Sequence, residues 1–83
     1  MTEKISINVK IVSLSVEHDF IVPYEMLVKD AVKLIVKIIS EEYPGTKRTE
    51  ENELIQISSG KKLNPTLSFK QMRIVSGDNL LLL

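Results

Sequence analysis

Residues 27 to 41 read LVKDAVKLIVKIISE, and this stretch decides the fold. Its apolar residues recur every three or four positions, which is the spacing of one face of an α-helix. The members of this face are Val28, Ala31, Val32, Ile35, Ile38 and Ile39. The pattern ends at Tyr43-Pro44-Gly45, because proline disfavours the helical conformation in the residue before it. The stretch therefore predicts one amphipathic helix of about four turns, whose apolar face another element must cover.

The residues before this helix have the period of two that is typical of β-strands. From Lys4 to Ile11 every odd position is apolar and every even position is polar, so one face of this strand is expected to be buried. A second alternation runs from Glu17 to Val22 and ends at Pro23, which cannot donate to a β-ladder. The turn expected near Ser13 to Ser15 is short, so the two strands should form an antiparallel hairpin.

The residues after the helix predict a polar loop and then a second group of strands. The expected elements are an exposed loop from Thr46 to Asn52, strands from Leu54 to Ser58, Lys61 to Leu63 and Leu80 to Leu83, and a helical turn from Ser68 to Met72 that Ser68 caps. Right-handed crossover geometry places the strands on either side of the helix in the same sheet. The predicted fold class is α+β: a β-grasp of the order ββαββ-turn-β, with a mixed sheet of about four to five strands packed on one helix. Residues 1–83 are expected to form a single domain.

The composition argues against several classes of function. The 11 basic and 11 acidic residues give a formal charge of zero, whereas nucleic-acid binders carry a basic excess, so no nucleic-acid partner is expected. The absence of cysteine excludes disulfides and thiolate metal ligands. No apolar run approaches the ~20 residues that span a bilayer, and Met1 to Lys4 does not begin a signal peptide. We therefore expect a cytoplasmic protein that does not insert into a membrane.

The sequence offers no catalytic constellation. His18 is the one histidine, and its neighbours Glu17 and Asp19 point to the opposite face of the predicted strand. A general base needs a partner group held beside it, and a metal site needs several ligands, so neither is predicted here. We expect His18 to be a partly buried residue at the edge of the sheet. The chain is predicted to have no enzymatic activity, no cofactor and no metal.

The sharpest candidate for a binding site is the outer face of the sheet. If Leu80 and Leu82 point to the core, alternation along this strand directs Leu81 and Leu83 outward. In the strand that begins at Leu54, both isoleucines are assigned to the core, which turns Leu54 and Gln56 outward. Because the last strand of a β-grasp lies beside the first and third, these side chains should gather in one patch with a polar rim. Such a patch indicates an interface. The alternative is that they are scattered surface leucines, which are common and indicate nothing. The predicted protein-binding residues are Leu54, Gln56, Leu81, Leu83, Asn8 and Lys10.

Three segments resemble the second half of ubiquitin: Ser59 to Leu63, Phe69 to Ile74, and Gly77 to Leu80. The resemblance implies a ubiquitin-like domain over nearly the whole chain. Conjugating and sulfur-carrying proteins of that group end in a flexible Gly-Gly tail, whereas residues 80–83 are four leucines in a predicted strand. The resemblance therefore implies a domain that undergoes neither conjugation nor sulfur transfer.

More narrowly, Val22-Pro23-Tyr24, Leu27 to Val32 and the final Gly77 to Leu83 resemble the YukD/EsaB family of small ubiquitin-like proteins. These proteins accompany the type VII (WXG-protein) secretion systems of Gram-positive bacteria, and a related domain is fused to membrane subunits of the mycobacterial version. The resemblance implies a non-catalytic accessory or regulatory subunit that binds cytosolic domains of the membrane-embedded secretion machinery, at the periphery of that complex. Two alternatives stay open: a ubiquitin-like adaptor of another pathway, and a homodimeric structural unit that uses the same sheet face.

Overall fold

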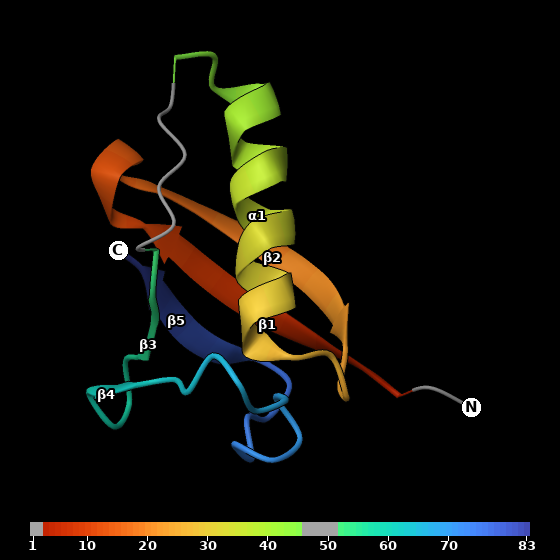
Figure 1. The fold of residues 1–83 in the computed structure, drawn as a ribbon. Helices are drawn as coiled ribbons and strands as arrows, with labels where there is room; N and C mark the ends of the chain where they lie inside the picture. Colours follow the sequence, from red (N-terminus) through yellow and green to blue (C-terminus); the bar gives the residue numbers. More distant parts are fainter. Residues whose placement is uncertain (1–2, 46–51) are drawn as a thin grey trace.

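Five strands form one mixed sheet, and an α-helix lies across one of its faces (Figure 1). The computed structural model describes residues 3–45 and 52–83, so residues 46–51 of the predicted polar loop lie outside the described part. The elements are β1 (Lys4–Ile11), a short 3-10 helix η1 (Val12–Leu14), β2 (Val16–Pro23), α1 (Val28–Glu42), β3 (Leu54–Gln56), β4 (Lys61–Lys62) and β5 (Asp78–Leu82). The strand order is β2-β1-β5-β3-β4, with β1 parallel to β5 and the other neighbours antiparallel. This arrangement confirms the predicted β-grasp.

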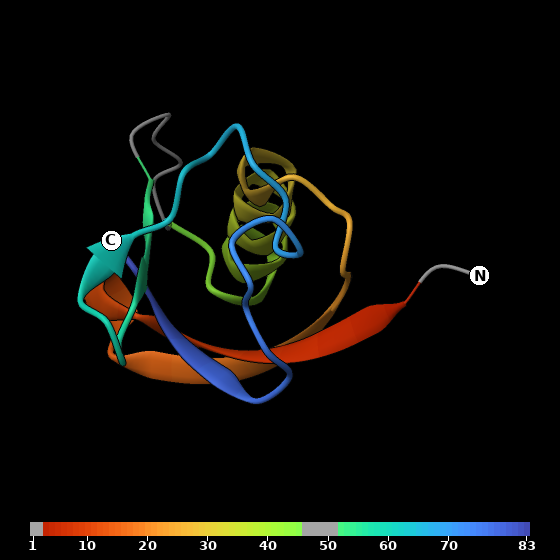
Figure 2. The ribbon, with the colours of Figure 1, turned by 90° about the horizontal axis from the view of Figure 1, so that it is seen from below.

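The hydrophobic core lies between α1 and the face of the sheet that curls around it (Figure 2). The odd positions of β1 are buried, as the alternation predicted. The other buried apolar residues of the core are Val22, Val28, Ala31, Ile35, Ile39, Leu54, Leu63, Phe69, Ile74, Leu80 and Leu82. Val32 and Ile38, which the helical spacing also assigned to the apolar face, are half-buried at its two margins.

The first turn of α1 is held by a neighbouring loop instead of a capping side chain. Leu27, at the N-cap position, makes no side-chain cap hydrogen bond. The N–H groups of Val28 and Lys29 donate to the carbonyl oxygens of Leu67 and Pro65, at 2.8 and 3.0 Å. Because the first N–H groups of a helix have no partner within it, these bonds satisfy donors that would otherwise be unpaired. They also fasten the helix to the segment that leads into β5.

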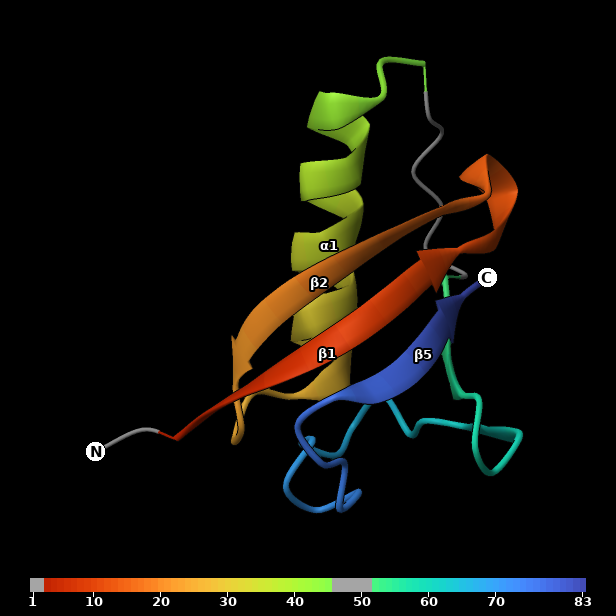
Figure 3. The ribbon, with the colours of Figure 1, turned by 180° about the vertical axis from the view of Figure 1, so that it is seen from behind.

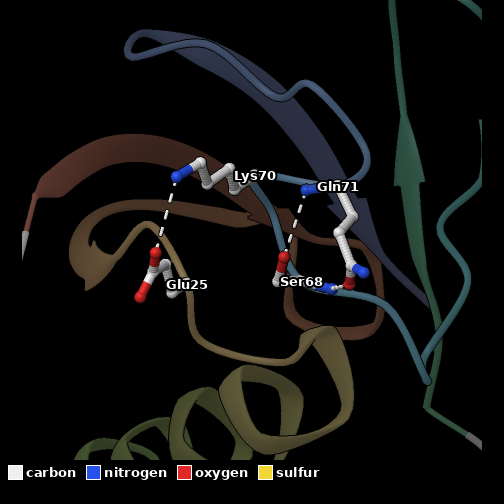
Figure 4. Close-up of polar contacts among 4 residues, drawn as sticks. All are labelled: Glu25, Ser68, Lys70 and Gln71. Atoms are coloured by element: carbon white, nitrogen blue, oxygen red, sulfur yellow. Dashed lines mark hydrogen bonds and ion pairs between the residues drawn. The ribbon is translucent and has the colours of Figure 1, made fainter.

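The segment before β5 contains a single turn that Ser68 caps (Figure 4). The Ser68 Oγ accepts a hydrogen bond from the Gln71 N–H at 3.1 Å, and the Gln71 Oε1 accepts one from the Ser68 N–H at 2.9 Å. This reciprocal pair has the geometry of a capping box. Beside it, Lys70 Nζ lies 3.5 Å from Glu25 Oε1 on the surface (Figure 4). The predicted cap at Ser68 is confirmed.

Removing the Ser68 hydroxyl should lower the free energy of unfolding by about 1 kcal/mol, the usual cost of losing an N-cap oxygen. Ser68 is buried, so the Gln71 N–H would lose its acceptor where water reaches it poorly. Urea unfolding of Ser68→Ala measures this change, and Ser58→Ala, at an exposed position, is the matched control. An unchanged midpoint in Ser68→Ala would show that the cap adds no stability.

Candidate functional site: the outer face of the sheet

The outer face of the sheet, on the side away from α1, brings the last leucines beside residues of β1 and β3. Figure 3 shows this side of the molecule, with β5 lying between β1 and β3. Leu81 lies opposite Lys10 on β1 and opposite Ile55 on β3. Residues opposite one another in neighbouring strands share a face, so these three side chains point to the same side. Leu80 and Leu82 are buried, which confirms that Leu81 points outward.

The structure corrects the predicted orientation of β3. Leu54 is buried and lies opposite Leu82, so it is a core residue and takes no part in the outer face. Gln56 lies opposite the buried Leu80, and therefore belongs to the side of the sheet that faces the helix. The prediction that Leu54 and Gln56 point outward is wrong.

Ile55 and Ile57 take the outward positions instead. Ile57 is 48% exposed, and its N–H donates to the carbonyl oxygen of Asn79 at 3.1 Å, which keeps it beside β5. The run from Leu54 to Ile57 carries apolar residues in both alternating sets, so no pattern within it shows which set is buried. Only the register with β5 settles the orientation, and sequence reasoning therefore missed both isoleucines.

We define the outer apolar patch as Ile55, Ile57, Leu81 and Leu83. Leu83 is 51% exposed, and its N–H donates to the carbonyl oxygen of Glu53 at 2.9 Å, so it continues the pairing of β5 with β3. Ile55 and Leu81 are half-buried and directly opposite one another. The patch thus extends along two adjacent strands outside the core, and an apolar cluster of this kind indicates an interface.

Polar and charged side chains border the outer apolar patch. On β1, Lys10 and Asn8 lie on the same face, as predicted, and the Asn8 Nδ2 donates to Asp19 Oδ1 at 3.1 Å. On the other side, Lys62 Nζ lies 2.6 Å from Glu53 Oε1 in an exposed ion pair. Exposed pairs contribute only about 0–1 kcal/mol to stability. A polar rim around an apolar centre is the usual composition of a protein interface.

His18 is partly buried on β2, which is an edge strand, as predicted. Its Nε2 lies 3.2 Å from the Tyr43 hydroxyl oxygen and 3.6 Å from Glu42 Oε2. Both partners lie at the end of α1, so the contacts tie the edge strand to the helix. This arrangement accounts for His18 as a structural residue.

Neither a metal site nor a membrane-crossing helix is found within the described residues. No group of three or more His, Asp or Glu side chains in residues 3–45 and 52–83 is placed to hold a metal ion. In the same part of the chain, α1 and η1 lack the length and apolar character that a membrane-crossing helix needs. The predicted lack of enzymatic activity, cofactor and metal stays a prediction.

Solved structures similar to this chain share the ubiquitin-like β-grasp fold. The N-terminal ubiquitin-like domain of the 4931431F19Rik protein matches with a TM-score of 0.78 at 20% identity, over 100% of this chain and 76% of that chain. The EccD5 ubiquitin-like domain from Mycobacterium xenopi matches with a TM-score of 0.77 at 15% identity, over 98% of this chain and 93% of that chain. A chain of the MycP5-free ESX-5 inner membrane complex matches with a TM-score of 0.75 at 16% identity, over 96% of this chain and 20% of that chain. No family model and no curated protein matches the chain.

Proposed function

We propose that the chain is one ubiquitin-like domain that binds another protein through the outer apolar patch and catalyses no reaction. The observation that carries the proposal is the pairing of Leu81 with Ile55 on the outer face, with Lys10 on one side and Lys62 on the other. The apolar centre would supply affinity, at ~25 cal/mol per Å² buried before the cost of association is subtracted. The charged rim would set the orientation of the partner.

The setting that we propose is a type VII secretion system, in which the chain acts as an accessory or regulatory component. The resemblance to YukD/EsaB proteins implies this setting. The likeness of fold to the EccD5 domain and to a chain of the ESX-5 inner membrane complex supports it. The partner would be a cytosolic domain of a membrane subunit, and the chain would be cytoplasmic, at the periphery of that complex.

Photo-cross-linking from position 81 tests this function in the organism that produces the chain. A photoreactive amino acid in place of Leu81 should form a cross-link to a subunit of the secretion machinery. The same group in place of Val75, which is 62% exposed and outside the outer apolar patch, should not. Adding Ile55→Lys should remove the cross-link, because binding would then desolvate a charge in the centre of the interface.

The identity of the cross-linked protein separates the alternatives. A protein of another pathway would assign the adaptor role, and a second copy of the chain would indicate the homodimer. Light scattering over a concentration range checks the homodimer independently. Equal cross-linking from positions 75 and 81 would contradict a binding role for the patch.

A further inference from the structure

The edge of the sheet formed by β2 has backbone groups that take no part in the outer apolar patch. β2 is the outermost strand beside β1 and is eight residues long. An edge strand presents backbone N–H and C=O groups that can pair with a further strand. The residues that present them can be identified from the hydrogen bonds of β1.

Hydrogen bonds at both sides of β1 show how its backbone groups alternate. The Ser6 carbonyl oxygen accepts from the Gly77 N–H at 2.7 Å, on the β5 side, whereas the Glu3 carbonyl oxygen accepts from the Tyr24 N–H at 2.8 Å, on the β2 side. Because successive residues direct these groups to opposite edges, the odd positions of β1 bond to β2, and they lie opposite the even positions of β2. The residues of β2 whose N–H and C=O groups point away from the sheet are therefore Glu17, Asp19 and Ile21. Within the described residues, these groups have no backbone partner.

The side chains of the same residues determine which partner suits this edge. Glu17 and Asp19 are exposed on the outer face, and neither forms an ion pair within residues 3–45 and 52–83. Ile21 is 71% exposed. Like charges directly opposite one another destabilise a strand pair and opposite charges stabilise it. A second copy of β2 would set acidic residues against acidic residues, whereas basic residues of another chain would be complementary.

The side of an added strand that faces the helix would meet apolar residues. Val36 lines a small hollow with Asn52, which lies two residues before β3, so this flank of α1 faces the β3 side of the sheet. Ile38 lies about 200° further around the helix, so the flank formed by Ile38 and Leu34 is directed toward β2. Leu34 is 42% exposed, and Ile38 and Phe20 of β2 are half-buried. Apolar side chains at alternate positions of an added strand could cover this margin.

We propose that β2 binds an extended segment of a partner protein as an additional strand of the sheet. Basic residues of the segment lie opposite Glu17 and Asp19, and apolar residues alternate with them on the side of α1. The free backbone groups supply affinity that any extended segment can use, and the alternation supplies specificity. This surface is separate from the outer apolar patch, so an experiment can contradict one of the two proposed binding roles and leave the other intact.

Amide hydrogen exchange tests the proposal with an acetylated, amidated peptide of alternating lysine and valine. In the free protein, the amides of Glu17, Asp19 and Ile21 should exchange faster than those of His18 and Phe20. Saturating peptide should slow exchange at residues 17, 19 and 21 by about tenfold or more. A peptide of alternating glutamate and valine should give no such protection. The lysine peptide with prolines at its central lysine and the valine that follows should give none either, because in either strand direction one of these two residues would have to donate its N–H to β2 and proline has none.

Variants connect the binding to the charges of the edge. Asp19→Lys should weaken peptide binding about tenfold, and Asp19→Asn, which keeps the side-chain shape, should weaken it less. Leu81→Lys should bind the peptide as the unmodified protein does, which separates this surface from the proposed function. Protection centred on Ile55 and Leu81, equal binding of the glutamate peptide, or no protection at about 1 mM lysine peptide would overturn the proposal.

Discussion

Leu80→Lys should leave no folded protein at room temperature, whereas Leu81→Lys should leave the domain folded. Leu80 is fully buried on the helix-facing side, between Val9 and Gln56 of the neighbouring strands. The substitution would lose ~1.5–3 kcal/mol of apolar burial and would add several kcal/mol for burying an unpaired ammonium group. A domain of 83 residues has a free energy of unfolding of only about 4–12 kcal/mol. The expected loss is therefore comparable with the whole stability.

The adjacent position is the matched control, because it carries the same substitution on the opposite face. Leu81 is half-buried on the outer face, so a lysine there can lay its methylenes on the sheet and keep its amine in water. We expect a change of about 1 kcal/mol or less. Circular dichroism and urea unfolding measure both variants. A folded Leu80→Lys protein beside an unfolded Leu81→Lys protein would mean that the faces of β5 are assigned in reverse, and the outer apolar patch would not exist.

Phe69→Ala should lower the free energy of unfolding by about 3–5 kcal/mol, the usual cost of truncating a buried aromatic side chain. Phe69 is fully buried. Its N–H donates to the Met26 carbonyl oxygen at 3.3 Å, and its own carbonyl oxygen accepts from the Ile74 N–H at 3.0 Å. The ring thus lies where the approach to α1 meets the segment that leads into β5. A cavity there would weaken packing on both sides, since the backbone bonds limit how far the site can collapse.

Urea unfolding of Phe69→Ala measures this cost. Val75→Ala is the control, because Val75 is 62% exposed and its truncation should change stability by no more than about 0.5 kcal/mol. If Phe69→Ala cost less than about 1 kcal/mol, the ring would not be a packed part of the core.

The sequence predicted the elements best where one face is buried along several turns or residues. The alternation from Lys4 to Ile11 matches β1 from end to end, and the helical spacing identified α1 to within a residue or two. Alternation along the strand also placed Leu81 on the outer face once Leu80 and Leu82 were assigned to the core. These predictions succeed because burial of one face constrains every second residue of a strand and every third or fourth of a helix.

The orientation of β3 and the free backbone groups of β2 depend on pairing between strands, which no local sequence pattern reveals. β3 has only three residues, with apolar side chains on both faces, so its orientation follows from the register in which Leu54 meets Leu82. The free backbone groups of β2 are a second case. Alternation shows where the side chains of Glu17 and Asp19 point, but their N–H groups are free only because of the register of β2 with β1 and because β2 is the outermost strand.

The parallel pairing of β1 with β5 affects how the protein is made. Ile7 lies opposite Asp78, so the central pair of the sheet joins residues from distant parts of the chain. During synthesis, β1, β2 and α1 are translated before β5, so the edge of β1 that pairs with β5 is unpaired until then. Closing so long a loop slows folding and leaves apolar surface exposed until β5 is in place. A chain truncated before residue 78 would contain the hairpin and the helix but would lack β5, the parallel partner of β1.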